Sequence, residues 1–468
     1  MQTINTNMDE RANLTWFYPR ICIYQDKIDN QEDYFRFLEI ETESRELSIY
    51  IHIPFCDSFC SYCACFKELS ALYKEDEKMA YVKALVKEMQ MYSNKTFFRN
   101  KEINYIQFGG GTPSCLSVDM YKVIFEGLHS CFTLSESCHI SLEGNVMTLK
   151  DMFKLKGLKG LGVDRLSFGL QTFNERIRKE LNIKAKVSEI FEATENIREV
   201  GFESLAVDLM YNLPDENLDI LKYDLEMIVG KIKPDYIQTY RFNQFHNTVL
   251  QKKISNGYFS NPPSGKKEFD MFAYILEFLK LNGYDNHVLI NLFSNKKSPI
   301  PTGLEYTMGN NKKSASMTLG IGAGASSFLN KRNYKSVCSV KKYIELISND
   351  MFPVEAGNIA SEEVLASRTM VYFPNFMQIR KTEIPNDDKY TTMLNELVQK
   401  KYIIEHNDRY ELSRLGIMWA GDISKLFFAD EEIEKNKKSV YYSIKNNTNP
   451  FNQDKMNMAN KNYIKKEK

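Results

Sequence analysis

Short apolar runs alternate with longer stretches of helical periodicity between about residues 48 and 240 of this chain. The runs are rich in β-branched residues, and all except the last precede a helical pattern such as the one at 78–91. This alternation is typical of βα units on a parallel sheet. The runs predict six strands, at 47–53, 103–108, 139–142, 165–170, 205–210 and 236–240. We therefore expect an α/β fold built on an incomplete TIM-like (β/α)6 barrel, with functional loops at the carboxyl ends of its strands.

The sequence outside this region predicts smaller units around the barrel. An amphipathic helix at 267–282, a loop at 294–316 and the small-residue turn LGIGAGASS at 319–327 predict an appended α+β layer that closes the barrel. The helical patterns and the turn YELSRLG that follow predict a small winged-helix-like domain. The expected boundaries are an N-terminal arm at 1–45, the core barrel at 46–245, the appended region at 246–350, the winged-helix-like domain at 351–430 and a flexible tail at 431–468.

The two ends of the chain have different compositions. Near its start an aromatic cluster, Trp16, Phe17 and Tyr18, precedes Pro19. This cluster predicts either an arm laid over a substrate opening or simple packing on the surface. The tail is rich in Asn and Lys and poor in aliphatic residues, which is typical of a segment without a packed core.

Length and charge limit the possible partners. A chain of 468 residues exceeds the size at which a single core keeps growing, so more than one unit is expected. Its 61 basic and 61 acidic residues cancel. Without a net positive field there is no electrostatic argument for nucleic acid or an anionic membrane as the main partner. A small-molecule substrate is therefore expected.

Two further features concern the location of the protein. The first twenty residues include Asp9, Glu10 and Arg11 and lack an apolar stretch, and no later window approaches the length of a membrane span. We expect no integral membrane segment and a cytoplasmic localisation. Four of the nine cysteines fall between residues 56 and 65, which indicates a metal or redox site in a reducing compartment rather than a disulfide framework.

Three of these cysteines, Cys56, Cys60 and Cys63, follow the first predicted strand as C-x3-C-x2-C. Thiolates are soft ligands, and so short a loop can wrap three of them around one [4Fe–4S] cluster. Three protein ligands leave one iron open to bind the amino and carboxylate groups of S-adenosylmethionine (SAM), so the spacing predicts radical SAM chemistry. A zinc site with Cys65 as fourth ligand is the alternative, but such sites usually present two separated C-x2-C knuckles.

Candidate SAM contacts follow the next predicted strands. The second strand ends in a turn with Gly109, Gly110, Gly111 and Thr112, where the missing Cβ atoms allow a ligand to approach the backbone closely. A tight turn without a ligand is the alternative. Later strands end in polar groups suited to an ammonium or to ribose hydroxyls, unless they serve as helix caps or loop hydrogen bonders. These groups are Glu143, Gln171 and Asp208.

The motifs YIHIPFC-x3-C-x2-C-x-C, GGGTPS, SLEGN, LSFGLQTFN and VDLMYNLP together resemble the oxygen-independent coproporphyrinogen III oxidase family of radical SAM proteins. The resemblance covers 48–250 strongly and extends to about 430 loosely. It implies Cys56, Cys60 and Cys63 as cluster ligands. It also implies SAM contacts, some of them to a second SAM molecule, at Tyr50, Tyr62, Gly110, Gly111, Thr112, Glu143, Gln171 and Asp208. The sequence departs from the family pattern at Ile183, Lys184 and Arg241, which weakens the case for the second SAM.

The family includes several activities, and the sequence carries features of more than one. Cys65 resembles an extra, catalytic cysteine of the true oxidases, which decarboxylate two propionates. The LEGN at 142–145, the GIGAGASS turn and the FPN at 373–375 resemble the anaerobic haem-degrading branch, whose members methylate and open the haem ring. A natural-product methyltransferase and a haem chaperone share the same core, although the chaperones' His-Asn-x-x-Tyr-Trp signature is absent between His287 and Leu319.

Haem breakdown is the function that we favour from the sequence, ahead of coproporphyrinogen III oxidation. The implied partners are a tetrapyrrole substrate and a low-potential electron donor of the flavodoxin or ferredoxin type. The segments 241–245, 287–293 and 312–327 offer aromatic residues, one histidine and several lysines for an apolar slot with cationic groups at its rim.

Overall fold

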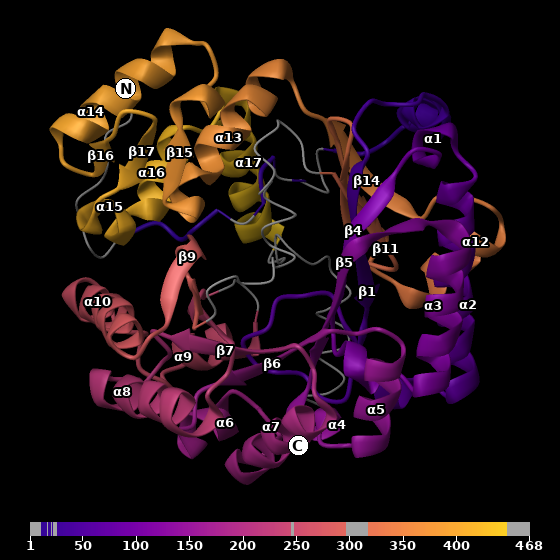
Figure 1. Ribbon diagram of the computed structural model, residues 1–468, viewed down its shortest axis with the longest axis horizontal. Coiled ribbons are helices and arrows are strands. Elements are labelled where there is room, and N and C mark those ends of the chain that lie inside the picture. Colours follow the sequence, from indigo (N-terminus) through magenta and orange to yellow (C-terminus); the bar gives the residue numbers. More distant parts are fainter. Residues whose placement is uncertain are drawn as a thin grey trace.

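Six parallel strands form the centre of the sheet in the computed structural model (Figure 1). The structure describes residues 11–446 except Trp16, Arg20, 22–25, 245–247 and 296–316. The strands are β1 (Glu46–Ile53), β4 (Glu102–Gly110), β5 (Thr133–Gly144), β6 (Arg165–Gln171), β7 (Ser204–Tyr211) and β8 (Tyr236–Arg241). Each pairs in parallel with the next, so all six predicted strands are confirmed. Strand β5 starts at residue 133 rather than 139, because Thr133 and Leu134 already pair with β4 ahead of an irregularity.

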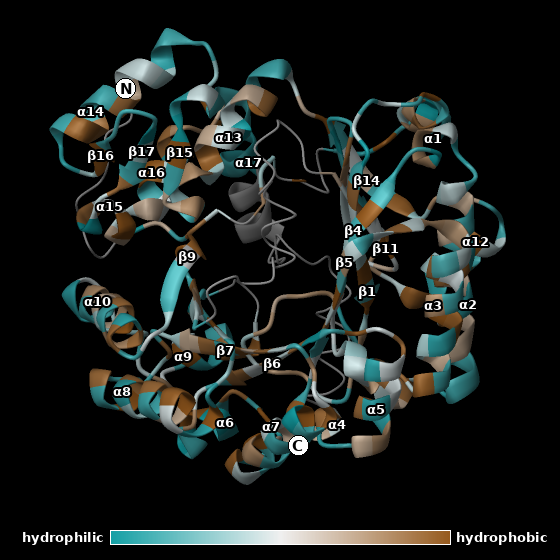
Figure 2. Ribbon diagram, in the orientation of Figure 1, coloured by the Kyte–Doolittle hydropathy of each residue, from teal (hydrophilic) through white to brown (hydrophobic). Residues whose placement is uncertain are grey.

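Helices connect these strands and cover the outer, convex face of the curved sheet (Figure 1). The main ones are α2 (Glu75–Ser93), α3 (Val118–Cys131), α5 (Met152–Gly160), α7 (Val187–Val200) and α8 (Leu218–Met227). They carry hydrophobic and hydrophilic residues side by side, as amphipathic helices with one buried face do (Figure 2). The strands follow a period of two. Ile49, Phe108 and Leu142 are fully buried on the helix side, whereas Tyr50 and Glu143 point to the inner side and stay partly exposed.

Further strands extend the sheet at both edges. β11 (Thr318–Ile321) pairs in parallel with β1, and β12 (Ser326–Leu329), β13 (Arg332–Ser336) and β14 (Val354–Ile359) continue from it. At the other edge, β10 (Leu292–Ser294) and β9 (Asp285–Leu289) follow β8. The α/β fold with an incomplete barrel is therefore confirmed, and over the described ranges the sheet stays open.

The appended region differs from the expectation in one respect. Its strands join the sheet of the barrel instead of forming a layer that closes it. The segment 319–327, expected to be one turn, contributes to β11 and β12 as well as to the turn between them. Small residues are needed because the two strands approach closely: a Cβ on Gly320 would lie 2.3 Å from the carbonyl oxygen of Ser326. The expected helix at 267–282 is confirmed as α10 (Lys266–Leu281), whereas most of the expected loop at 294–316 lies outside the described residues.

The last part of the chain is a helical unit with a small sheet of its own. It contains α13 (Glu362–Phe376), α14 (Asp388–Gln399) and α16 (Ala420–Leu426), with the antiparallel strands β15 (Gln378–Arg380), β17 (Arg409–Leu412) and β16 (Ile403–Glu405) in that order. This composition fits the expected winged-helix-like domain. Part of the expected flexible tail is the helix α17 (Asp430–Asn446), whose acidic first turn suits the helix dipole. Lys435 forms an ion pair with Asp26 at 2.8 Å. Residues 447–468 lie outside the described part.

The N-terminal segment fastens this helical unit to the barrel. The Arg11 guanidinium forms an ion pair with Glu268 of α10 and donates a 2.9 Å hydrogen bond to the carbonyl of Met418. The N–H of Ala12 donates to Asp422 at 3.0 Å. Of the aromatic cluster, Phe17 is exposed, Tyr18 is buried among the C-terminal helices and Trp16 lies outside the described residues.

Candidate functional site

The cysteine loop leaves the carboxyl end of β1, and a small parallel pairing closes it. β2 (Phe55–Cys56) pairs with β3 (Glu68–Leu69), so both ends of the loop are fixed beside each other. Inside the loop, the N–H of Cys63 donates to the carbonyl of Cys60 at 3.3 Å. The three sulfurs of Cys56, Cys60 and Cys63 lie close enough for a charge on one to raise the pKa of its neighbours. The structure therefore brings the three candidate ligands together.

Burial dominates the acid–base properties of this loop. It raises the pKa of the Cys56 thiol to about 12 and that of Cys60 to about 11. The Cys65 thiol donates a hydrogen bond to the Cys63 sulfur, which lowers the pKa of Cys63 and raises that of Cys65. A buried thiol releases its proton readily only when it binds a metal ion, and thiolates are soft ligands that suit the iron of Fe–S clusters. The donor set thus fits a cluster.

The glycine turn after β4 packs directly against the loop. The N–H of Gly111 donates to Ile53 at 2.8 Å, and that of Thr112 donates to Phe55 at 2.7 Å. The hydroxyl of Thr112 lies 3.3 Å from the Cys56 sulfur. Gly110 has φ +115°, and a Cβ on Gly111 would lie 2.7 Å from the carbonyl oxygen of Phe55. Close packing of the two loops thus explains Gly111, and the positive φ and the nearby ring of His52 explain Gly110. Contact with SAM is a further role that we propose for both.

Two carboxyl groups lie beyond this turn on the inner face of the sheet. Burial, then the neighbouring Asp208 and Cys63, raises the pKa of Glu143 to about 8. Burial also raises the pKa of Asp208 to about 7, against the effect of the Arg165 guanidinium. Both side chains keep some solvent exposure, so they border accessible space. Tyr62 of the loop is similar: burial and the sulfurs of Cys60 and Cys63 raise its pKa well above its ordinary value.

Gln171 carries the clearest sign of a ligand-binding role. Its backbone has φ +68°, which an L-residue adopts at a cost in energy. A Cβ on Gly169 would lie 2.3 Å from its amide nitrogen, so a glycine is required to make room for this side chain. Its Oε1 is buried and has no hydrogen-bond partner among the described residues. An orphaned acceptor on the inner face fits a donor group of a bound molecule.

Two residues of the site were missed from sequence. The ring of His52 lies 3.1 Å from the Tyr50 hydroxyl through Nδ1 and 3.2 Å from the carbonyl oxygen of Phe66 through Nε2. Burial lowers the pKa of His52 to about 4, so the ring is neutral. Lys67 is buried, and its Nζ donates to the carbonyls of Cys63 at 3.1 Å and Cys65 at 3.4 Å. Burial would lower the pKa of Lys67, but the cysteine sulfurs outweigh it and the pKa is raised. In the sequence, His52 could have been recognised as a polar residue on the same inward face as Tyr50, and Lys67 as a cation four residues after Cys63.

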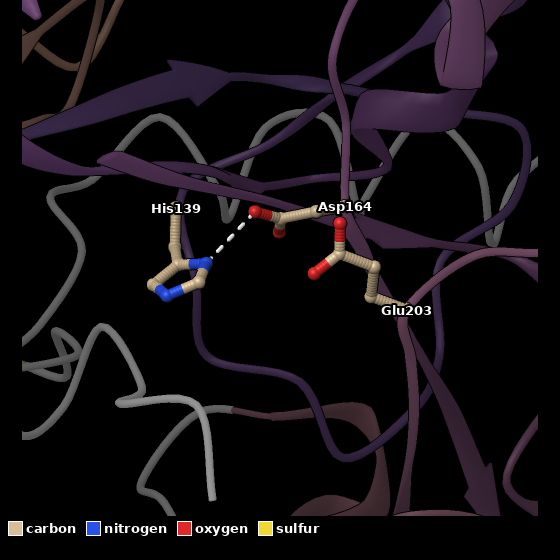
Figure 3. A group of neighbouring side chains, drawn as sticks. All are labelled: His139, Asp164 and Glu203. Carbon is tan, nitrogen blue, oxygen red and sulfur yellow. Dashed lines mark hydrogen bonds and ion pairs between the residues drawn. The ribbon is translucent and has the colours of Figure 1, made fainter. Parts of the chain in front are cut away.

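A second group of potential metal ligands, His139, Asp164 and Glu203, lies toward the other end of the strands (Figure 3). Asp164 and Glu203 directly precede β6 and β7, whereas the cysteine loop follows the carboxyl end of β1. Nδ1 of His139 and the N–H of Ile140 both contact Oδ2 of Asp164, at 2.9 and 3.3 Å. These bonds tie the start of β6 to β5, and we assign no metal to this group.

Comparison with known proteins gives the same class. Residues 50–228 match the family model of the radical SAM superfamily. The heme chaperone HemW of Lactococcus lactis subsp. lactis is 27% identical over 400 residues, which cover 82% of this chain and 98% of that protein. The anaerobilin synthase of Escherichia coli O157:H7 is 26% identical over 390 residues, 81% of this chain and 83% of its own. The solved structure of coproporphyrinogen III oxidase (HemN) from Escherichia coli matches with a TM-score of 0.74 and 19% identity, covering 90% of this chain and all of that one.

The chain therefore contains a radical SAM domain, in agreement with the loop of three cysteines. More narrowly, its relatives and its motifs make it similar to the coproporphyrinogen III oxidase-like radical SAM proteins. Its cofactors are those of the superfamily, a [4Fe–4S] cluster and SAM, and the zinc alternative is set aside. Within the described ranges, no helix has the length and apolar character needed to cross a membrane.

Proposed function

We propose that this chain is a radical SAM enzyme in which Cys56, Cys60 and Cys63 hold the cluster. The observation that carries the proposal is the convergence of three thiols in one loop, with Cys56 buried and Cys60 and Cys63 half-buried, closed by the pairing of β2 with β3. When bound and reduced, the cluster supplies an electron to the sulfonium of SAM, which releases methionine and a 5′-deoxyadenosyl radical. The fixed ends of the loop keep the thiols in place without a fourth protein ligand.

The inner face supplies acceptors for SAM. A carbonyl oxygen can only accept, so Nε2–H of His52 donates to Phe66, and Nδ1 is left to accept the hydrogen of the Tyr50 hydroxyl. The hydroxyl oxygen of Tyr50 then offers its lone pairs to an ammonium group. Glu143, with its pKa raised to about 8, is mostly protonated at neutral pH without a ligand, and an arriving ammonium favours its ionised form. Gln171 offers its orphaned oxygen to a hydroxyl or an ammonium.

The remaining proposed SAM contacts surround these groups. Asp208 stands on β7 beside Glu143, and burial raises its pKa to about 7 although the Arg165 guanidinium opposes this rise. The hydroxyl of Thr112 borders the Cys56 sulfur, while Gly110 and Gly111 approach the ring of His52 and the backbone of Phe55. Tyr62 stands beside Cys60 and Cys63. A second SAM molecule is compatible with Arg241, because this side chain pairs with Glu268 of α10 and therefore points away from the inner face.

For the substrate we propose a tetrapyrrole, and specifically haem, which the enzyme methylates and opens. The names of the matched relatives support the class, since they concern heme, anaerobilin and coproporphyrinogen. The motifs at 142–145 and 373–375 support the choice of haem. At the start of the expected rim segments, Arg241 is engaged by Glu268 and donates to the carbonyl of Arg11 at 2.8 Å. Residues 245 and 312–316 of the expected rim and the side chain of His287 lie outside the described part.

The second candidate is oxygen-independent coproporphyrinogen III oxidation, and Cys65 favours it. This residue is exposed, touches Cys63 and influences the pKa of Tyr50 and Tyr240, so its thiol faces the space in front of the cluster loop. A thiol there is suited to donate a hydrogen atom or a proton to a substrate intermediate. In either reaction a low-potential donor of the flavodoxin or ferredoxin type supplies the electron.

A competition assay tests the proposal. The anaerobically reconstituted and reduced protein is given SAM with haem and coproporphyrinogen III, separately and together. We expect the Soret band of haem to bleach and an open, methylated tetrapyrrole to form, while coproporphyrinogen III keeps its carboxylates. Carbon dioxide release with intact haem would support the oxidase instead. Stoichiometric binding of intact haem without SAM cleavage would support a chaperone, and inertness toward both would favour a natural-product methyltransferase.

A further inference from the structure

Lys67 is a buried cation beside the cluster loop. Only 4% of the residue is exposed, and its Nζ also lies 5.5 Å from the centre of the Phe59 ring. Its ammonium donates two hydrogen bonds, both to carbonyl oxygens of the loop, those of Cys63 and Cys65. Among the described residues, no carboxylate forms an ion pair with it. Burying a charge is costly unless an opposite charge compensates it.

A comparison with Lys101 shows that Lys67 lacks an oxygen acceptor for one of its N–H donors. Lys101 has the same exposed fraction, 4%, and also lies over a phenylalanine ring. Its three N–H donors have three oxygen acceptors, on Thr42, Ser44 and Asn100, at 2.6 to 3.0 Å. Lys67 has oxygen acceptors for only two of its three donors, and the side chains that act on it most strongly are those of the loop cysteines, Cys63 first. The uncompensated charge of Lys67 therefore faces sulfur.

We infer that Lys67 is the charge partner of the cluster and raises its reduction potential. This inference rests on the proposed function, because it requires a cluster on Cys56, Cys60 and Cys63. Three thiolates give the ligated cluster a net negative charge, and uptake of one electron from a low-potential donor makes that charge one unit more negative. No bond forms or breaks in this step, and the donor is oxidised by one electron. A fixed positive charge in a dry loop stabilises the reduced state more than the oxidised one, so reduction becomes easier.

The hydrogen bonds of Lys67 add a second contribution. They hold the carbonyl groups of Cys63, which is the last proposed cluster ligand, and of Cys65, which is the extra cysteine two residues later. A neutral side chain with N–H donors preserves part of this bonding, and an apolar one removes it. The charge and the hydrogen bonds can therefore be separated by substitution. Lys67 is accordingly a positioning residue that acts through the cluster ligands.

The test is a potentiometric titration of the full-length, reconstituted protein with SAM absent, followed by electron paramagnetic resonance of the reduced cluster. Lys67→Gln removes the charge and keeps donors, whereas Lys67→Met removes both. We expect both variants to hold the cluster with a more negative potential. At a fixed potential near the wild-type midpoint, the ratio of reduced to oxidised cluster should fall at least about tenfold, which corresponds to ~59 mV for a one-electron couple. Lys101→Met is the matched control and should leave the potential unchanged.

The outcomes are distinct. An unchanged potential in Lys67→Gln and Lys67→Met at full iron and sulfide content overturns the inference. If both variants lose the cluster, Lys67→Arg decides: a retained cluster at near wild-type potential supports the requirement for charge, and loss of the cluster there too assigns Lys67 a purely structural role and overturns the inference. If wild-type protein itself takes up no cluster, the proposed function fails first, and the inference fails with it.

Discussion

The hydroxyl of Tyr50 donates its hydrogen to Nδ1 of His52 across 3.1 Å. Because Nε2–H of the same ring donates to the carbonyl of Phe66, the tautomer of His52 is fixed. This tautomer in turn fixes the direction in which the Tyr50 hydroxyl points its hydrogen. Phe66 follows Cys65 directly. The histidine thus connects a proposed SAM contact on β1 to the end of the cluster loop.

This connection predicts that Tyr50 and His52 act as one unit in SAM binding. Tyr50→Phe removes the acceptor oxygen, and His52→Leu leaves it without a fixed orientation. Each change should weaken SAM binding about tenfold, the value of one hydrogen bond to a charged group. The double variant should bind SAM no more weakly than Tyr50→Phe alone. Titration calorimetry on reconstituted protein measures the affinity, with the cluster absorbance as a control. Additive losses would mean that the two residues act independently.

A second prediction concerns Cys65, whose thiol touches Cys63 without belonging to the proposed ligand set. Cys65→Ser should keep the cluster spectrum and the cleavage of SAM in the absence of substrate, and should lose most of the turnover of the tetrapyrrole. Separate assays of 5′-deoxyadenosine, S-adenosylhomocysteine and tetrapyrrole products check this. If the variant lost the cluster, Cys65 would be a ligand. Full activity of the variant would show that Cys65 is a small thiol with a packing role only.

The buried carboxyl of Glu88 gives a prediction for stability. It accepts hydrogen bonds from the N–H of Gly322 at 2.9 Å and from the Tyr343 hydroxyl, and burial raises its pKa from 4.5 to about 7. The folded state therefore binds more protons than the unfolded state between these values, so the free energy of unfolding falls as pH rises from about 4.5 to about 7 and is flat above. The full effect is about 3 kcal/mol.

Glu88→Gln keeps an acceptor and removes the titration. Urea unfolding of wild type and of the variant at several pH values between 4.5 and 8 measures both free energies. Their difference should change by about 3 kcal/mol over this range, because the contributions of other groups cancel. A difference that is independent of pH would show that Glu88 has the same pKa in both states.

The N-terminal segment supplies a second stability test. Glu268 is fully buried and pairs with Arg11, while Arg241 stands further away at 3.6 Å. Arg11→Met should destabilise the protein by about 3 kcal/mol, since a buried carboxylate loses its main partner. Double replacement of Arg11 and Glu268 by Met and Gln should recover part of this loss in denaturant unfolding. An unaffected single variant would mean that the segment does not fasten the C-terminal helices to the barrel.

The sequence was sufficient for the central strands because their information is local. Each has an apolar helix-facing side at a period of two, and the motifs at their carboxyl ends lie within a few residues of the strand. The pairing of β11 with β1 depends instead on residues 270 positions apart, such as Ser48 and Thr318, and no local pattern reports it. The same holds for Arg11 and Glu268, which are 257 positions apart.

The same distinction holds for the candidate site: some of its residues could be predicted from local sequence, and others depend on the folded structure. Cys56, Cys60 and Cys63 are recognisable by spacing alone, because three thiols so close together in one loop can bind a single cluster. His52 and Lys67 stand in the same stretch of sequence, yet their roles depend on which atoms surround them after folding. Arg241 shows the same dependence on folding, since its side chain pairs with Glu268 of α10.

The central claim is that three cysteines of one loop hold a cluster that cleaves SAM. The most direct measurement is iron content, visible absorption and SAM cleavage after anaerobic reconstitution and reduction, in wild type and in the Ala variants of Cys56, Cys60 and Cys63. Cys115→Ala is the matched control, since this free thiol lies 3.8 Å from the carbonyl oxygen of Phe55, next to Cys56. We predict a [4Fe–4S] cluster and SAM cleavage in wild type and control, and neither in the three variants. Zinc without iron in the wild type, or full SAM cleavage in any of the three variants, would contradict the account.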